Sequence, residues 1–313
     1  MKGLELARAY FEACGLPMLR ERFPDVLPLL AAGLCGSGSE CFGYDDGISR
    51  DHDFDPGFLL FLPGEDQVSR RQAFLLERAY AGLPKEFGGL TRGMMQPVGG
   101  PRRGVVRTKE FFTSHAGTAD GHMTPAQWLA TPEHALAEAV NGAVFFDGCG
   151  EVTAIRGALA RYPEDVRRKK LAACLLLMGQ SGQYNYARCL KHGETGAAQL
   201  AVHEFAQNAM HAVFLLNGRY MPFYKWAFRA MRELPLLSLH AELIEYLITT
   251  DNGEEMAEEK QNVMEGMASD LIDELQRQDL TRAVCGDLEK HAYSVNDGIE
   301  DGEIRNLHIL AAV

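Results

Sequence analysis

The chain has 313 residues, 46% of them hydrophobic and 24% charged, with a formal net charge of −12 at pH 7. This is the composition of a globular protein, and the length suffices for one large domain or two ordinary ones with a sizeable core. The acidic balance disfavours broad electrostatic binding to DNA or RNA, so we expect a small-molecule substrate rather than a nucleic acid.

The seven cysteines are scattered along the chain and form no C-x-x-C pair, which argues against a disulfide framework and a cysteine zinc site. We therefore expect all of them to be packing residues. The N-terminal stretch is interrupted by Glu5, Arg8 and Glu12, where a signal peptide needs an unbroken apolar core. No segment approaches the roughly 20 apolar residues of a membrane span. These features predict a cytoplasmic protein without a membrane partner.

Apolar periodicity and turn residues predict the elements of the first half of the chain. Amphipathic helices are expected over residues 2–14 and 65–81, and short helices after Pro125 and Pro132. Buried strands are expected at four places, namely 27–35, 58–62, 105–108 and 143–146. The stretch 82–101 is rich in Gly and Pro and is predicted to be a loop.

After about Arg156 the strand pattern disappears and only helical patterns remain. The expected helices cover 164–190, 196–217, 222–233, 236–249, 254–278 and 281–292. A mixed first half and an all-helical second half predict the α+β class. We expect a small mixed β-sheet domain with flanking helices over residues 1–157, followed by an all-α helical bundle over residues 158–313.

A Gly/Ser turn and an aspartate cluster precede the strand expected at 58–62. The turn "GSGSECFG" includes Gly38 and Ser39, and a turn of this kind can offer backbone N–H groups and a hydroxyl to phosphate oxygens. Asp51 and Asp53 lie two residues apart, so on an extended strand both carboxylates project from one face. Such a pair suits Mg²⁺, and a phosphate cradle beside a metal pair is typical of phosphoryl or nucleotidyl transfer.

These residues carry a family resemblance. Gly38-Ser39, the later Gly43, Ser49 and the run Asp51 to Phe54 resemble the signature of the polymerase-β-type nucleotidyltransferase superfamily. Within it, the chain is similar to bacterial nucleotidyltransferase-like proteins of uncharacterised function, relatives of the antibiotic nucleotidyltransferases. The stretches "FLLNGRYMPFYKW" (214–226) and "HAYSVNDGIEDGEIRNLHIL" (291–310) also look like that group.

The resemblance implies a role for each matching residue. Gly38 and Ser39 would hold the phosphates of a nucleoside triphosphate, expected to be ATP, and Asp51 and Asp53 would bind Mg²⁺. An acceptor hydroxyl would attack the α-phosphate and release pyrophosphate. Residues 1–157 would then form the nucleotidyltransferase-like domain and 158–313 a helical domain that binds a small-molecule acceptor.

One departure from the family pattern concerns a third carboxylate, which active members usually add from a neighbouring strand. The expected strand at 105–108 contains no acid, and the first one after it is Glu110. Glu110 is therefore the weak candidate for this position. The catalytic base is otherwise expected from the helical half, or is missing.

The helix expected at 196–217 places Glu204, Asn208 and His211 on one stripe. This stripe is either an ordinary solvated face or the lining of a site in which Glu204 acts as general base, a role for which Glu194 competes. Further along, Lys225 is the candidate for a phosphate contact. Trp226, beside it, is expected to pack in the core.

Plainer interpretations remain open beside these. "GSGSECFG" can be a linker, and Asp45 and Asp46 are expected to be solvated turn residues. A calcium loop is disfavoured, because Pro56 and Leu62 occupy the positions where an EF-hand needs Gly and Glu. Two other functions are kept: a catalytically inactive nucleotide-binding or regulatory protein of the same fold, and a nucleotidyltransferase that modifies a protein or a tRNA. The acceptor, the preferred base and the oligomeric state stay open.

Overall fold

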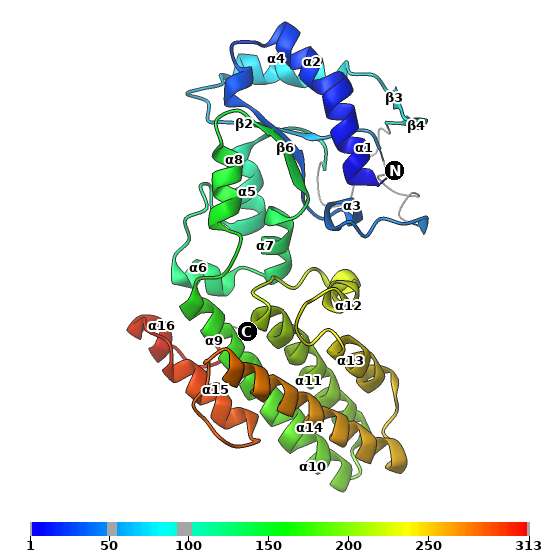
Figure 1. Ribbon diagram of the computed structural model, residues 1–313, viewed down its shortest axis with the longest axis vertical. Coiled ribbons are helices and arrows are strands. Elements are labelled where there is room, and N and C mark those ends of the chain that lie inside the picture. Colours follow the sequence, from blue (N-terminus) through cyan, green and yellow to red (C-terminus); the bar gives the residue numbers. More distant parts are fainter. Residues whose placement is uncertain (1, 49–54, 93–101, 312–313) are drawn as a thin grey trace. The chain divides into compact units, whose positions relative to one another are not determined.

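A computed structural model describes residues 2–48, 55–92 and 102–311 of the chain (Figure 1). The chain forms two compact units, the first made of residues 1–123 and 135–160 and the second of residues 124–134 and 161–313. We call them the sheet unit and the helical unit, because every described strand lies in the first. The protein thus has an α+β fold with a small mixed sheet and a helical part. The expected domain cut at 157/158 stays a prediction; residues 124–134 group with the helical unit.

The main sheet of the sheet unit has four strands in the order β5-β2-β1-β6. Their bounds are Ala31–Leu34 for β1, Leu59–Leu62 for β2, Gly104–Arg107 for β5 and Ala143–Asp147 for β6. β1 pairs antiparallel with β2 through Gly33 and Leu59, and antiparallel with β6. β2 pairs parallel with β5. All four expected strands are present, although the first is preceded by a 3-10 turn at Leu27–Leu29.

Helices cover both faces of this sheet because its central strands are apolar on both sides. α1 (Gly3–Tyr10), α2 (Leu16–Arg22) and α4 (Arg70–Ala81) share one core with Phe58, Leu60 and Leu62. On the opposite face, Phe61 meets Phe111 of α5 (Thr108–Ala116) with the ring centroids 5.2 Å apart. Figure 1 shows α1, α2 and α4 on one side of the strands and α5 with α8 (Glu151–Ala158) on the other.

Several expectations for this unit need correction. The first helix continues beyond residue 14 as a π-helical segment, Phe11–Gly15, that leads into α2. The helix expected from 65 begins only at Arg70, because Ser69 and Gln72 form a capping box that fixes its start. The predicted loop 82–101 contains a two-stranded hairpin, β3 (Glu86–Phe87) with β4 (Leu90–Thr91). α5 and α8 were not predicted; both are short, and they follow β5 directly and β6 after three residues.

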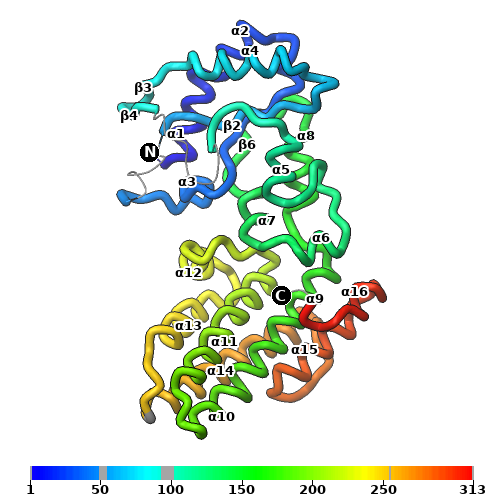
Figure 2. Tube along the Cα trace, turned by 180° about the vertical axis from the view of Figure 1, so that it is seen from behind, coloured from blue at the N-terminus to red at the C-terminus, as the bar shows by residue number. Residues whose placement is uncertain are grey.

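The helical unit packs its helices around one large apolar core. Its elements are α6 (Pro125–Ala130), the start of α7 (Glu133–Val140), α9 (Glu164–Met178), the π-helical segment η4 (Gly179–Asn185), α10 (Tyr186–Lys191), α11 (Thr195–Leu216), α12 (Tyr224–Arg232), α13 (His240–Thr249), α14 (Glu254–Arg277), α15 (Leu288–Asp297) and α16 (Gly302–Asn306). α11 packs against α9, α10 and α13, and α15 packs against α9, as the view from behind shows (Figure 2). The helix expected at 281–292 begins only at Leu288, where Asp287 caps it.

A close helix contact explains one glycine of this unit. Gly182 lies in η4, and a Cβ added there would be 2.4 Å from Cδ2 of Phe205 on α11. Gly182 therefore lets the buried ring of Phe205 lie directly against the backbone of η4. Among the described helices, none is long and apolar enough to cross a membrane.

Candidate functional site

The predicted phosphate turn lies at one edge of the sheet. β1 ends at Leu34 and the chain continues into the Gly36–Ser39 turn, while the antiparallel β2 begins at Leu59, opposite Gly33. β5 begins at the same edge, since it runs parallel to β2 and pairs Gly104 with Leu59. β6 begins there too, because Ala143 pairs with Leu34. This edge, which we call the turn edge, therefore collects the end of β1 and the starts of the other three strands.

Asn141 holds the turn in place. Its side-chain oxygen accepts a hydrogen bond from the N–H of Gly36 at 2.9 Å, and its amide donates to the carbonyl of Gly36 at 2.7 Å. Gly36 has a φ of +118°, a conformation that side-chain-bearing residues rarely adopt. The helix that follows, α3 (Ser39–Phe42), has only four residues, so its own dipole contributes little. The geometry of the turn thus depends on Asn141 and Gly36 more than on α3.

A buried ion pair sits beside this turn. Oε1 of Glu40 lies 3.2 Å from a terminal guanidinium nitrogen of Arg103, and the two side chains are 6% and 12% exposed. The Glu40 carboxylate folds back onto Gly38, where an added Cβ would be only 2.4 Å from Oε2. The Arg103 side chain passes over Gly57, just before β2. The pair therefore ties α3 to the residues in front of β2 and β5.

The two candidate metal ligands Asp51 and Asp53 lie outside the described residues. Within the described part, no group of three or more His, Cys, Asp or Glu side chains could hold a metal ion. Glu110 belongs to α5, which follows the far end of β5, so the weak candidate for a third carboxylate lies at the opposite edge of the sheet from the turn. The prediction for Asp45 is wrong: its carboxylate is buried and accepts the N–H of Gly3 at 2.9 Å. Asp46 is exposed, as expected.

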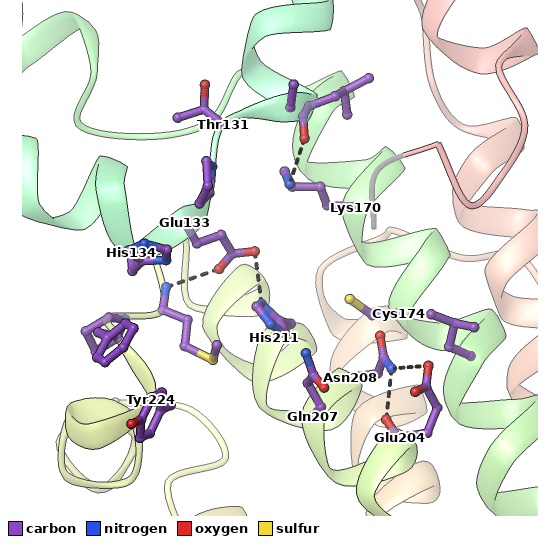
Figure 3. A pocket seen from close by; sticks show the side chains of 17 residues that line it. Thr131, Glu133, His134, Lys170, Cys174, Glu204, Gln207, Asn208, His211 and Tyr224 are labelled. Atoms are coloured by element: carbon purple, nitrogen blue, oxygen red, sulfur yellow. Dashed lines mark hydrogen bonds and ion pairs between the residues drawn. The ribbon is translucent and has the colours of Figure 1, made fainter. Parts of the chain in front are cut away.

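The helical unit contains a pocket of about 510 Å³. It is lined by the segment 129–134, by α9, by α11 and by residues 221–224 in front of α12. Figure 3 shows Glu133, Lys170, Glu204 and His211 around it. Its volume lies in the range of small-molecule sites, and polar groups are mixed with apolar walls such as Leu177 and Phe223.

A carboxylate and an imidazole meet in this pocket. Oε1 of Glu133 lies 3.2 Å from Nδ1 of His211, and Oε2 accepts the backbone N–H of Met221 at 3.1 Å. The Glu133 side chain is 7% exposed, and it stands in the first turn of α7, where the helix dipole stabilises a negative charge. Figure 3 shows Glu133 and His211 pointing toward one another from α7 and α11. We call these two residues the Glu133–His211 dyad.

The polar stripe predicted on α11 contributes three side chains to this pocket. Glu204, Asn208 and His211 all line it, together with Gln207. Asn208 is buried, and its amide donates to the carbonyl of Glu204 at 2.8 Å and to Oε1 of Glu204 at 3.3 Å. Glu204 itself is exposed to solvent at the rim. The geometry therefore gives Glu204 access to a ligand.

Lys170 and Cys174 form the α9 wall of the pocket. Lys170 is buried, with its ammonium 3.3 Å from the carbonyl of Leu129 at the end of α6 and 5.5 Å from the ring centre of Tyr162. Burial and the nearby Glu133 carboxylate raise the pKa of the Cys174 thiol well above its ordinary value. Cys174 is thus a neutral wall residue and not a nucleophile. All seven cysteines are free thiols.

Lys225, the predicted phosphate contact, does not line this pocket. It is exposed, with its ammonium 5.1 Å from the ring centre of Trp226, which is only half buried. Sequence reasoning missed Glu133 and Lys170 here, and Asn141, Glu40 and Arg103 at the turn edge. The sequence offered two signals for them, namely Pro132-Glu133 at a helix start and Lys170 before the apolar run LAACLLLM.

Comparison with known proteins identifies one similarity. Residues 128–227 match the model of a domain of unknown function, DUF4037. The match covers about a third of the chain and includes every residue that lines the pocket of the helical unit, whereas it leaves out the Gly/Ser turn and the aspartate cluster. No curated protein and no solved structure matches the chain.

Proposed function

We propose that the protein is a Mg²⁺-dependent nucleotidyltransferase that transfers a nucleoside monophosphate from a nucleoside triphosphate, expected to be ATP, to a hydroxyl of a small molecule. The observation that carries this proposal is the turn edge of the sheet. The chain leaves β1 through the Gly36–Ser39 turn and returns at the same edge into β2, as the Gly33–Leu59 pairing requires. The connection between them is the segment whose sequence contains Asp51 and Asp53.

This arrangement supports the roles that the family resemblance implies. Gly38 and Ser39 would contact the phosphates, in a turn that Asn141 fixes. Asp51 and Asp53 would hold the Mg²⁺, which neutralises charge on the phosphates when bound.

The helical unit would bind the acceptor. Its pocket is large enough for a small organic molecule and offers carboxylate, amide, ammonium and imidazole groups next to aromatic side chains. Lys225 lies outside the pocket. Because its side chain is exposed, Lys225 stays a candidate for a contact with a phosphate. Glu204 stays a candidate for the general base.

One observation favours a second function, a catalytically inactive nucleotide-binding protein of the same fold. The residue that precedes β5 at the turn edge is Arg103, and the nearby carboxylate of Glu40 is paired with it. Neither residue supplies a free third carboxylate. An inactive protein would bind the nucleotide and release no pyrophosphate.

Calorimetric titration with ATP and Mg²⁺ tests the proposal, with the Asp51→Asn/Asp53→Asn variant beside the wild type. We expect the variant to lose Mg²⁺-dependent binding. The matched control is Asp66→Asn, an exposed aspartate after the far end of β2, which should bind as the wild type does. Equal binding by the wild type and the double variant would contradict the metal role.

Pyrophosphate release over a panel of hydroxyl compounds then separates the two functions. Release that depends on one class of acceptor supports the transferase. ATP binding without release on any acceptor supports the inactive protein. Incubation of labelled ATP with a cell lysate shows whether label reaches a protein or a tRNA instead of a small metabolite.

A further inference from the structure

We propose that His211, held by Glu133, is the group that takes up the proton of a ligand hydroxyl in the pocket of the helical unit. The sequence pointed to Glu204 for this role, whereas the geometry points to the Glu133–His211 dyad. The use of His211 as a catalytic base rests on the proposed nucleotidyltransferase function. The ability of His211 to accept a proton follows from the pocket alone.

The first argument is the position of the proton on the imidazole. Nδ1 of His211 lies 3.2 Å from the buried carboxylate of Glu133, so the field of that carboxylate favours a proton on Nδ1. The second carboxylate oxygen accepts the N–H of Met221, which fixes the orientation of the carboxylate. Neutral His211 therefore keeps a lone pair on Nε2.

The second argument is access. His211 lines the pocket, and its side chain is 24% exposed. Among the residues that the structure describes, none bonds to Nε2. A ligand hydroxyl in the pocket can therefore donate its hydrogen to this atom. This selects hydroxyl-bearing ligands over ligands that offer only acceptor atoms.

The third argument compares the two candidates as bases. Imidazole is the side-chain group that most often acts as a general base in enzymes. Glu204 is exposed, and one of its oxygens already accepts the Asn208 amide. The Glu133 carboxylate also stabilises the imidazolium that forms when His211 takes up a proton.

In the proton transfer, the O–H bond of the ligand breaks, its proton bonds to Nε2 of His211, and the electron pair of that bond stays on the ligand oxygen. The imidazolium then releases its proton to solvent.

The first experiment needs no catalysis. Long-range ¹H–¹⁵N spectra of the full chain, labelled at histidine and assigned with His211→Gln, report which ring nitrogen carries the proton. We expect a protonated Nδ1 and a bare Nε2 at pH 8, and a loss of this preference in Glu133→Ala. A proton on Nε2 in the wild type would overturn the proposal.

The second experiment measures pyrophosphate release. We expect His211→Ala to lower kcat by about 10²- to 10⁴-fold and to regain part of its rate with added imidazole. His192→Ala, at an exposed histidine outside the pocket, is the control variant and should retain most of its rate. A large loss in Glu204→Gln, with His211→Ala near wild type, would overturn the assignment in favour of Glu204.

The two experiments separate this inference from the proposed function. If the wild type releases no pyrophosphate, both the transferase and the catalytic use of His211 are overturned. An unprotonated Nε2 in the spectra would then still support His211 as a proton acceptor in the pocket. A wild type that transfers normally with His211→Ala unimpaired overturns the base and leaves the transferase standing.

Discussion

Arg103 and Glu40 are 63 positions apart in the sequence and form a buried ion pair, with a terminal guanidinium nitrogen 3.2 Å from Oε1 of Glu40. This contact connects the residue before β5 to the short helix after the Gly/Ser turn. Both charges are largely removed from water, so each charged side chain is stabilised in the folded protein mainly by the other. The pair is therefore a structural requirement of the turn edge.

The first prediction concerns this pair. Arg103→Met leaves the Glu40 carboxylate buried without its partner and should reduce the free energy of unfolding by about 3–5 kcal/mol. The double variant Arg103→Met/Glu40→Gln removes both charges and should recover much of that loss. Glu40→Gln alone completes the cycle, and urea unfolding followed by circular dichroism measures the wild type and all three variants. If the double variant loses as much as the sum of the two single variants, the residues are not coupled.

The second prediction concerns the contact between η4 and α11. Gly182→Ala introduces a Cβ 2.4 Å from Cδ2 of Phe205, and overpacking of this kind should cost about 1–3 kcal/mol. Gly266→Ala is the matched control, because Gly266 is exposed in α14 and an added Cβ there meets nothing within 4 Å. It should instead stabilise the protein by about 0.4–1 kcal/mol.

Tryptophan fluorescence during urea unfolding distinguishes the two glycine variants. Both tryptophans, Trp128 and Trp226, lie in the helical unit, so the signal reports on that unit. Opposite shifts of the midpoint are expected for Gly182→Ala and Gly266→Ala. A wild-type midpoint for Gly182→Ala would show that Phe205 can move aside without cost.

The third prediction is a pH dependence of stability from His240. This residue is buried at the start of α13, with Nε2 3.0 Å from a carboxylate oxygen of Asp270. Burial lowers the pKa of His240, and the opposing effect of Asp270 is smaller. The unfolded chain therefore binds a proton at a higher pH than the folded one. His240 contributes stability above about pH 6.5, and this contribution is lost as the pH falls below it.

The His240→Gln variant tests that dependence. The difference in unfolding free energy between wild type and variant should shrink as the pH falls from 7.5 to about 5.5, with a slope of at most about 1.4 kcal/mol per pH unit. A difference for His240→Gln that stays constant with pH would rule out the proposed linkage.

Local sequence patterns were sufficient for the elements with strong apolar signals. All four strands of the main sheet and the long helices α9, α11 and α14 follow from runs and periodicities that lie within the elements themselves. The patterns failed where the deciding signal was short or not apolar. α5 and α8 are brief helices shortly after strands, and the β3–β4 hairpin interrupts a stretch rich in Gly and Pro.

For the candidate site, the sequence by itself determined which residue types stand near one another along the chain. It placed Gly38 and Ser39 after one strand and Asp51 and Asp53 before the next, and it placed Glu204, Asn208 and His211 on one helical stripe. These are local relations that the period of a strand or a helix fixes.

Only the tertiary structure decided the partners of these residues. Glu133 reaches His211 across 78 positions of the chain, and Asn141 reaches Gly36 across 105. Such contacts depend on how the helices and strands pack, which no local period encodes. Burial then sets the charge state and the accessibility of each group, so the same acidic residue type becomes an exposed rim residue at Glu204 and a buried partner of His211 at Glu133.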